Sequence, residues 1–265
     1  MRAGAVALVA CVGCTRVPYT HRPQDLAVPS SLSAALGQST YAAVRARDTR
    51  LSATDDARRV AAVGAAVGRA ARLTGAAWEV TLFDRDTLDL WCLPGGYVGV
   101  HAGALPVARD EAGLAHALGH AVAHAVARHP AERLGQQLAL FGGLGGLYAS
   151  LDPRTPLPPA TRGALWGALG VGDVGSVAPP FARLQEEEAD AIGLLLAAGA
   201  GYPPAAAGAF WDGVAARADD PRTRAFRALH PADVDRRARL AAWLPLAEKK
   251  YARNRRPDDP SAARW

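Results

Sequence analysis

The stretch His120-Ala121-Val122-Ala123-His124 places two histidines four residues apart in a long run of helix-forming residues. Side chains at positions i and i+4 lie on one face of a helix, so both imidazoles can bind the same metal ion. Asp110 is a good N-cap, Glu111 suits the first turn, and Pro130 ends the pattern. The sequence therefore predicts a helix that presents a metal-binding pair of histidines.

A metal site built on this pair needs a further protein ligand. The best candidate is Glu186, within the stretch Glu186-Glu187-Glu188-Ala189-Asp190 of a second predicted helix. Asp190 follows Glu186 by one turn on the same face, where it can accept a hydrogen bond from a ligand imidazole and fix its tautomer. Histidine pairs and acidic triplets are each common on ordinary helices, but their combination favours a site of His120, His124 and Glu186.

The segment before the histidine helix has an extended pattern. Residues 78–83 alternate partly, residues 88–93 and 97–101 are short apolar runs, and Pro94-Gly95-Gly96 separates the last two. This predicts an antiparallel meander with a sharp turn at the glycines. Half of all residues are hydrophobic and only 6% are aromatic, which favours closely packed helices. The expected fold class is α+β, mainly helical, with a small antiparallel sheet beside the metal-binding helix.

The organisation expected along the chain is one folded domain over residues 31–247. An extended arm over residues 15–30, which contains three prolines, precedes it, and a signal-like segment covers residues 1–14. A charged, mobile tail over residues 248–265 follows the domain.

The charge distribution gives no sign of a nucleic-acid partner. The formal net charge is +5, and the sequence pI is about 9.4. Arginines alternate with acidic residues, as at Arg236-Arg237 beside Asp233 and Asp235, and no basic stripe alternates with aromatics. A solvated basic surface is therefore expected, with no nucleic acid bound.

The three cysteines are Cys11, Cys14 and Cys92, and neither their number nor their spacing predicts a disulfide scaffold or a thiolate metal site. Leu8-Val9-Ala10-Cys11 ends a short apolar run and resembles the lipobox of a bacterial lipoprotein signal. We expect export and lipidation at Cys14 or Cys11; the alternative is a frayed apolar N-terminus. No later stretch has the length of a transmembrane helix.

Several motifs follow one another in a definite order. They are Pro94-Gly95-Gly96, His120-x-x-x-His124, Phe181-x-Arg183-x-x-Glu186-x-Glu188-Ala189-Asp190-x-x-Gly193, Gly201-Tyr202-x-Pro204 and His230-Pro231. This series resembles the HtpX-like zinc metallopeptidases of the gluzincin group, which includes the CAAX prenyl-peptidase relatives. The closest resemblance is to the periplasmic lipoprotein branch that includes the beta-barrel assembly-enhancing protease, and it covers most of the chain.

The resemblance implies roles for the polar residues. His120, His124 and Glu186 would bind one Zn²⁺, and Asp190 would orient a ligand histidine. His230 would point towards the cleft and stabilise the charge that develops on the substrate.

The resemblance also implies a polypeptide substrate. Tyr97, Val98, Gly99 and Val100 would form an edge strand along the cleft, to which a peptide adds by backbone hydrogen bonds. The expected role is proteolysis and protein quality control in the bacterial cell envelope. The protein would be periplasmic and lipid-anchored, with outer-membrane proteins as a candidate class of client.

Ala121 departs from the HExxH motif of these enzymes, in which a glutamate takes a proton from the attacking water. Alanine accepts no proton, and losing general acid–base assistance removes on the order of 10²–10⁴-fold in rate. Asp89 in place of a frequent asparagine and Ala182 in place of a frequent serine are milder departures. Three interpretations stay open: an impaired zinc endopeptidase, a zinc-binding pseudoprotease that holds unfolded polypeptides or acts as an assembly factor, and an engineered knockout.

Four other residues are expected to have structural roles. His116, one turn before His120, is predicted to be packed or hydrogen-bonded beside the site, and His129 to cap the C-terminal end of the histidine helix. Cys92 is predicted to be a small buried hydrophobe and Trp211 a core residue.

Overall fold

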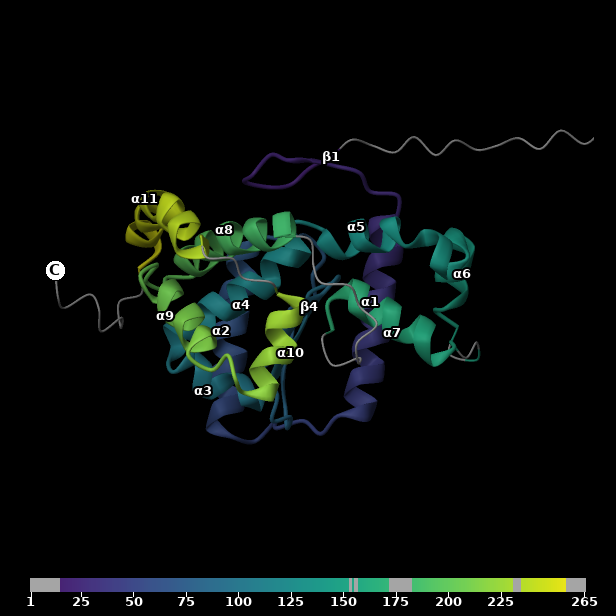
Figure 1. Cartoon of the computed structure of the whole chain (residues 1–265), viewed down its shortest axis with the longest axis horizontal. Helices are drawn as coiled ribbons and strands as arrows, with labels where there is room; N and C mark the ends of the chain where they lie inside the picture. Colours follow the sequence, from purple (N-terminus) through teal and green to yellow (C-terminus); the bar gives the residue numbers. More distant parts are fainter. Residues whose placement is uncertain (1–14, 153, 155–156, 172–182, 231–234, 256–265) are drawn as a thin grey trace, which may run out of the picture.

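The computed structural model describes residues 15–152, 154, 157–171, 183–230 and 235–255. Figure 1 shows a small sheet and the helix α4 enclosed by other helices. The strands are β1 (Thr15–Arg16), β2 (Pro23–Gln24), β3 (Glu79–Phe83), β4 (Leu90–Leu93) and β5 (Tyr97–His101). The helices are α1 (Ser30–Arg47), α2 (Asp55–Ala71), α3 (Leu105–Ala108), α4 (Glu111–Val126), α5 (His129–Gln136), α6 (Gly143–Ala149), α7 (Pro159–Leu169), α8 (Arg183–Gly199), α9 (Ala206–Ala215), α10 (Pro221–Leu229) and α11 (Arg236–Asn254), with 3₁₀ helices η1 (Ala102–Ala104) and η2 (Leu138–Phe141). The predicted α+β, mainly helical class is confirmed.

The three-stranded sheet has the order β3-β5-β4, with β5 in the middle. β5 pairs antiparallel with β4 and parallel with β3. The prediction of a purely antiparallel meander is therefore wrong. Gly95 and Gly96, at φ 94° and 87°, make the predicted turn between β4 and β5, in a conformation that favours glycine.

The connection between β3 and β4 explains the different order. Residues 84–89 cross the end of β5 instead of folding back beside β3. The backbone N–H of His101 donates to Asp89 O at 3.0 Å, and that of Gly103 donates to Arg85 O at 3.0 Å. These bonds fix the crossing segment to the residues that continue β5, so the parallel pairing of β3 and β5 is held at this end.

Helix α4 forms where the sequence predicted it. The side chain of Asp110 accepts a hydrogen bond from the N–H of Gly113 at 2.8 Å, which satisfies one of the donors that a helix start leaves unpaired. Its residues are small and apolar on almost every side, and α4 is buried among α2, α8, α9 and β4. A helix that is apolar all round belongs in a core, so α4 holds the histidines away from water.

Two glycines set the distance between α4 and α8. A Cβ atom on Gly119 would lie 2.6 Å from Gly193 O, and one on Gly193 would lie 2.6 Å from the backbone nitrogen of His120. Atoms at that distance clash, so the two backbones touch here only because neither residue has a side chain. This contact brings the histidine face of α4 against the acidic face of α8.

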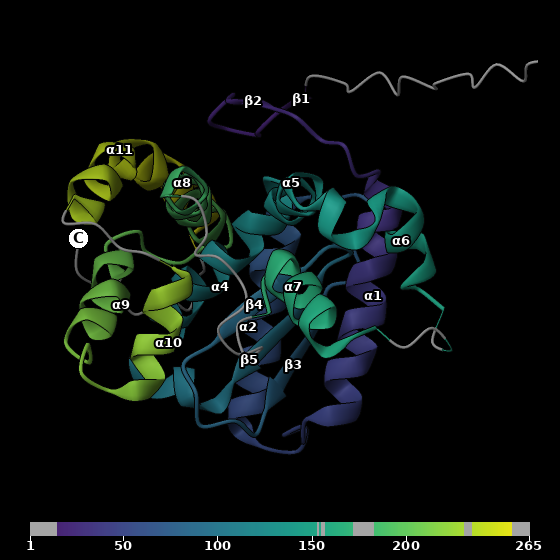
Figure 2. The same ribbon diagram turned by 45° about the vertical axis from the view of Figure 1, so that its right-hand side comes forward.

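The N-terminal arm is more ordered than predicted. β1 and β2 pair as an antiparallel ribbon, and residues 15–24, called here the arm hairpin, pass over α5 and α8 (Figure 2). At the other end α11 continues to Asn254, so the tail boundary predicted at residue 248 falls inside a helix. None of the described helices is both long and apolar enough to cross a membrane.

Candidate metal centre

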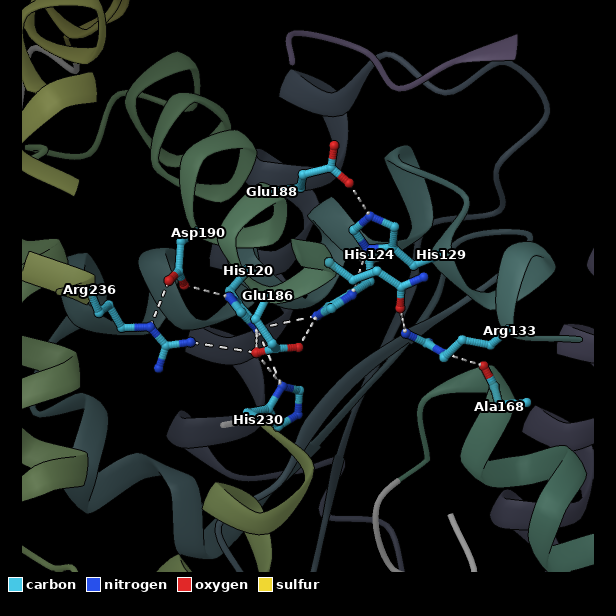
Figure 3. Close-up of polar contacts among 11 residues, drawn as sticks. His120, His124, His129, Arg133, Ala168, Glu186, Glu188, Asp190, His230 and Arg236 are labelled. Carbon is cyan, nitrogen blue, oxygen red and sulfur yellow. Dashed lines mark hydrogen bonds and ion pairs between the residues drawn. The ribbon is translucent and has the colours of Figure 1, made fainter. Parts of the chain in front are cut away.

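Four buried side chains converge where α4, α8 and the end of α10 meet (Figure 3). His120 and His124 come from α4, Glu186 from the first turn of α8, and His230 is the C-cap residue of α10. One nitrogen or oxygen atom of each lies within 4.8 Å of the others. The structure therefore brings the three predicted ligands together and adds His230 to them.

The distances among these atoms suit one metal ion. His120 Nε2 lies 3.3 Å from His124 Nε2 and 3.4 Å from Glu186 Oε2. His230 Nδ1 lies 3.1 Å from Glu186 Oε2 and 3.4 Å from His120 Nε2. Ligand atoms around a tetrahedral zinc ion, at bond lengths of about 2.0–2.2 Å, are separated from one another by about 3.3–3.6 Å. The nitrogen and oxygen donors of this group therefore fit Zn²⁺.

Glu186 supplies the negative charge of the site. Burial raises the pKa of its carboxyl group, but His230 and His120 outweigh burial and hold the pKa well below its usual value. Glu186 Oε1 is buried and lies 3.3 Å from His124 Nε2, but it makes no aligned hydrogen bond with a residue that the structure describes. A buried carboxylate oxygen that accepts no hydrogen bond is unfavourable unless a cation binds it, which supports a metal ion at this position.

Asp190 and Arg236 hold His120 from behind, as Figure 3 shows. His120 Nδ1 donates to Asp190 Oδ1 at 3.0 Å, which leaves the lone pair of Nε2 directed into the site. Arg236 Nε donates to Asp190 Oδ2 at 2.6 Å, and its guanidinium lies 3.6 Å from the centre of the Trp211 ring. Asp190 thus lies where a tautomer-fixing carboxylate was predicted. Arg236, expected on a solvated surface, is instead buried at the site, and Trp211 packs against it.

The charges beside His120 also change its protonation. Burial lowers the pKa of this imidazole, but Glu186 and Asp190 raise it, and the result is about 9. Burial instead lowers the pKa of His124 well below its usual value. A proton therefore competes with a metal ion for His120 but not for His124 at neutral pH.

His124 is held through a second imidazole. His124 Nδ1 lies 2.9 Å from His129 Nδ1, and His129 Nε2 lies 3.1 Å from Glu188 Oε2. The carboxylate can only accept, so His129 Nε2 donates to it and His129 Nδ1 accepts from His124. The Nε2 lone pair of His124 is then directed at the metal site. The predicted helix cap at His129 is wrong, because this residue begins α5 and its ring turns back towards α4.

Ala121 lines a small cavity beside the ligands. Its volume is about 10 Å³, and its walls include His124, His230, Cys92 and Arg133, with Leu90, Trp91, Leu169 and Gly170 completing them. That is room for about one water molecule. Among the described residues no carboxylate lines this cavity.

The strand beside the site is β4 and not β5. Tyr97, Val98, Gly99 and Val100 belong to the central strand, and their backbones already pair with strands on both sides. The prediction that they form an edge strand for a substrate is wrong. In the described sheet β4 is the edge next to the ligands, and its residues 90–92 line the cavity at Ala121.

Two other predicted residues have structural roles. His116 Nε2 bonds to Pro203 O at 2.9 Å and is not a member of the ligand group. Cys92 is buried, and burial raises the pKa of its thiol to about 12, as expected for a small hydrophobe. Cys11, Cys14 and Ala182 lie outside the described residues.

A helix pair that carries two imidazoles and a carboxylate beside a small sheet defines a zincin-type metallopeptidase domain. Residues 54–244 match the sequence model of peptidase family M48, and the chain belongs to this family. The site is accordingly a site for one zinc ion.

Three curated relatives share the name mitochondrial metalloendopeptidase OMA1. The chain is 32% identical to the protein from Schizosaccharomyces pombe over 174 residues, which are 65% of this chain and 48% of the relative. It is 28% identical to that from Saccharomyces cerevisiae over 190 residues, 68% of this chain and 50% of the relative. For Arabidopsis thaliana the identity is 33% over 132 residues, 50% and 24% of the two chains. The chain thus spans about half the length of the two yeast relatives.

These relatives correct the predicted location. All three are named as mitochondrial proteins, so the prediction of a lipid-anchored protein of the bacterial periplasm is wrong. They also give no support to the HtpX-like, periplasmic lipoprotein branch. Membership of a zinc metallopeptidase family and the use of one zinc ion are confirmed.

Proposed function

We propose that this protein is a zinc-dependent metalloendopeptidase of low turnover. The buried ligands His120, His124 and Glu186, with His230 beside them, carry the proposal, because three donors at this spacing suit a zinc ion that keeps one position open. Membership of the M48 family and the endopeptidase names of the relatives support the same class of reaction. The substrate class is an unfolded polypeptide.

Zinc supplies Lewis-acid chemistry when bound, which polarises the carbonyl group of a peptide bond. The chain contributes the positions around that carbonyl. A substrate strand would add to the outer edge of β4, and His230 would donate a hydrogen bond to the oxygen on which charge develops. Asp190 and His129 keep the ligand imidazoles in the tautomers that metal binding needs.

The weak point of the catalytic machinery is proton transfer. In the part of the chain that the structure describes, Ala121 and the walls of its cavity offer no carboxylate that can take a proton from the attacking water. We expect a rate about 10²–10⁴-fold below that of a protein with a glutamate at this position.

A second candidate function is supported by the closed geometry of the site. His230 Nδ1 lies close enough to Glu186 and His120 to complete four protein ligands, as in structural zinc sites. The cavity beside Ala121 holds about one water molecule and no peptide. These features favour a zinc-binding pseudoprotease that holds unfolded polypeptides without cutting them.

Three proteins separate the two functions: the chain as given, Ala121→Glu, and Ala121→Gln, which matches the glutamate in size but accepts no proton. Bound zinc is measured for each, and cleavage of unfolded casein is followed with and without a chelator. Slow cleavage by the given chain that the chelator abolishes, and that Ala121→Glu but not Ala121→Gln accelerates, supports the endopeptidase. Zinc binding without any cutting by the given chain supports the pseudoprotease, and the absence of zinc from all three rules out both.

A further inference from the structure

The arm hairpin reaches the carboxylate behind His124. Thr20 Oγ1 donates to Glu188 Oε1 at 2.8 Å, and Arg22 Nε lies 3.0 Å from each oxygen of the same carboxylate. Glu188 is only 4% exposed. A buried carboxylate keeps its charge and its direction only where several donors surround it, and the hairpin supplies two of those donors.

The same guanidinium also holds the next helix. Arg22 Nη1 donates to Glu132 Oε1 at 2.8 Å and Arg22 Nη2 to Glu132 Oε2 at 2.9 Å. Glu132 belongs to α5 and Glu188 to α8, so Arg22 bridges two helices. Gln24 Nε2 adds a bond of 2.6 Å to Ala127 O, at the C-cap of α4. The hairpin thus makes hydrogen bonds to the end of α4, which carries His124, and to α5 and α8.

Glu188 carries this contact on to the metal site. Its Oε2 accepts the hydrogen bond of His129, and His129 in turn accepts that of His124. Its two oxygens face the hydroxyl of Thr20, the guanidinium of Arg22 and the ring of His129, all of which can donate. The carboxylate therefore acts as an acceptor, and this gives the two imidazoles their order of donor and acceptor.

We propose that the arm hairpin is a positioning element of the metal centre, in which Arg22 and Thr20 orient Glu188, and Glu188 orients His124 through His129. The hairpin lies outside the segment that matches the family, which begins at residue 54. Its role concerns the affinity for zinc and not hydrolysis, so the proposal rests on the zinc site of the proposed function but holds whether or not the protein cuts a peptide.

The test measures the dissociation constant for zinc by competition with a chromophoric chelator, on the whole chain. Arg22→Ala is compared with Arg16→Ala, because Arg16 lies on the same hairpin but, among the described residues, donates to His21 O within its own turn and to no residue of the metal centre. Partners of a metal-bound histidine change metal affinity by about 10–100-fold. We expect a loss of that size for Arg22→Ala, a smaller loss for Arg22→Lys, which keeps the charge without the fork, and none for Arg16→Ala.

A mutant cycle shows whether the effect passes through the imidazole of His129. In a His129→Phe background, Arg22→Ala should change zinc affinity no further, since the path is already broken. If His129→Phe does not fold by circular dichroism, Glu188→Gln serves as the background. Equal zinc affinity for the Arg22→Ala and Arg16→Ala proteins would overturn the proposal. So would an Arg22→Ala loss that persists undiminished in the broken background, because the hairpin would then act only by stabilising the fold.

Discussion

The two ligand imidazoles of α4 are held from opposite ends of the chain, and in different ways. His120 is bonded directly to Asp190, which Arg236 of α11 holds. His124 is bonded to His129, then Glu188, then Arg22 of the arm hairpin. Both arrangements end in an arginine, but the first has one link fewer.

The α11 side also reaches the site a second time. Arg236 Nη2 lies 3.5 Å from Glu186 Oε2, so this arginine also contacts one ligand directly, whereas Arg22 contacts a ligand only through other residues. Arg236 is 5% exposed, and the side chain of Arg22 is 19% exposed. The α11 side has fewer hydrogen bonds between imidazole and arginine, and its arginine is more deeply buried. We therefore expect it to contribute more to both stability and zinc affinity than the hairpin side. The arm hairpin and α11, which are far apart in the sequence, therefore help to orient the ligand imidazoles that α4 carries.

The largest effect should follow from removing the ligand that lies against both imidazoles, Glu186. Glu186→Gln removes the anionic ligand, and we expect bound zinc to fall from stoichiometric to undetectable in elemental analysis. Glu187→Gln is the matched control, since Glu187 pairs with Arg183 and Arg239 outside the site. Retention of zinc by the Glu186→Gln protein would show that Glu186 is not a ligand and would contradict the proposed metal site.

The two arginines can then be compared with each other. Arg236→Ala leaves the buried Asp190 with only His120 as a described partner, and we expect it to lower the free energy of unfolding by about 3–5 kcal/mol. Arg22→Ala should lower it by less, because its partners lie closer to solvent. Urea unfolding of chelator-treated protein measures both. Arg237→Ala is a control with an expected change of about 0–1 kcal/mol, since Arg237 pairs with Asp212 on the surface. A larger loss for Arg22→Ala than for Arg236→Ala would reverse the ranking.

The pH dependence of stability in zinc-free protein should test the contact between Asp190 and His120 on the α11 side. In zinc-free protein the pKa of His120 is raised to about 9. Between the unperturbed histidine pKa of about 6.5 and pH 9, the folded state then binds more protons than the unfolded state. The contribution of His120 to the free energy of unfolding is therefore complete below about pH 6.5 and is lost as the pH rises through 9. Melting temperatures in a chelator at pH 6.5 and pH 9.5 should show this decline. Asp190→Asn should flatten it, and an unchanged slope would show that Asp190 does not set the protonation of His120.

The smallest effect is expected at the hydroxyl of the hairpin. Thr20→Val removes one hydrogen bond to Glu188 but leaves Arg22 in place, so we expect a loss of about 0.5–1.5 kcal/mol in the free energy of unfolding. Zinc affinity should change less than in the Arg22→Ala protein. An effect on affinity equal to that of Arg22→Ala would assign the orientation of Glu188 to the hydroxyl and not to the guanidinium.

The part of the site that depends on local geometry could be predicted from the sequence. The spacing of His120 and His124 fixes their common face, and Asp190 follows Glu186 by one turn, so these relations hold wherever the helices form. The strand order could not be predicted in the same way. A segment as short as 84–89 can either fold back or cross a neighbouring strand, and bonds from the last residue of β5 and from Gly103 just after it decide between the two paths.

Contacts between distant segments could not be predicted either. Arg236 and Arg237 are neighbours of the same type, yet one is buried against Asp190 and the other pairs with Asp212 at the surface. Nothing in their immediate sequence separates them. The prediction for His129 fails because a proline is compatible with both ends of a helix. The sequence predicts that Pro130 ends one helix, whereas it lies in the first turn of the next, where proline is also favoured.

Gly119 and Gly193 bind nothing and take no part in any proton transfer, yet the contact between them permits the centre to assemble. The smallest possible enlargement, a single methyl group, would wedge the two helices apart and separate His120 from Glu186. During sequence divergence these two positions should therefore drift as little as the zinc ligands themselves. A survey of homologous chains would count them as fixed for reasons of space and not of chemistry.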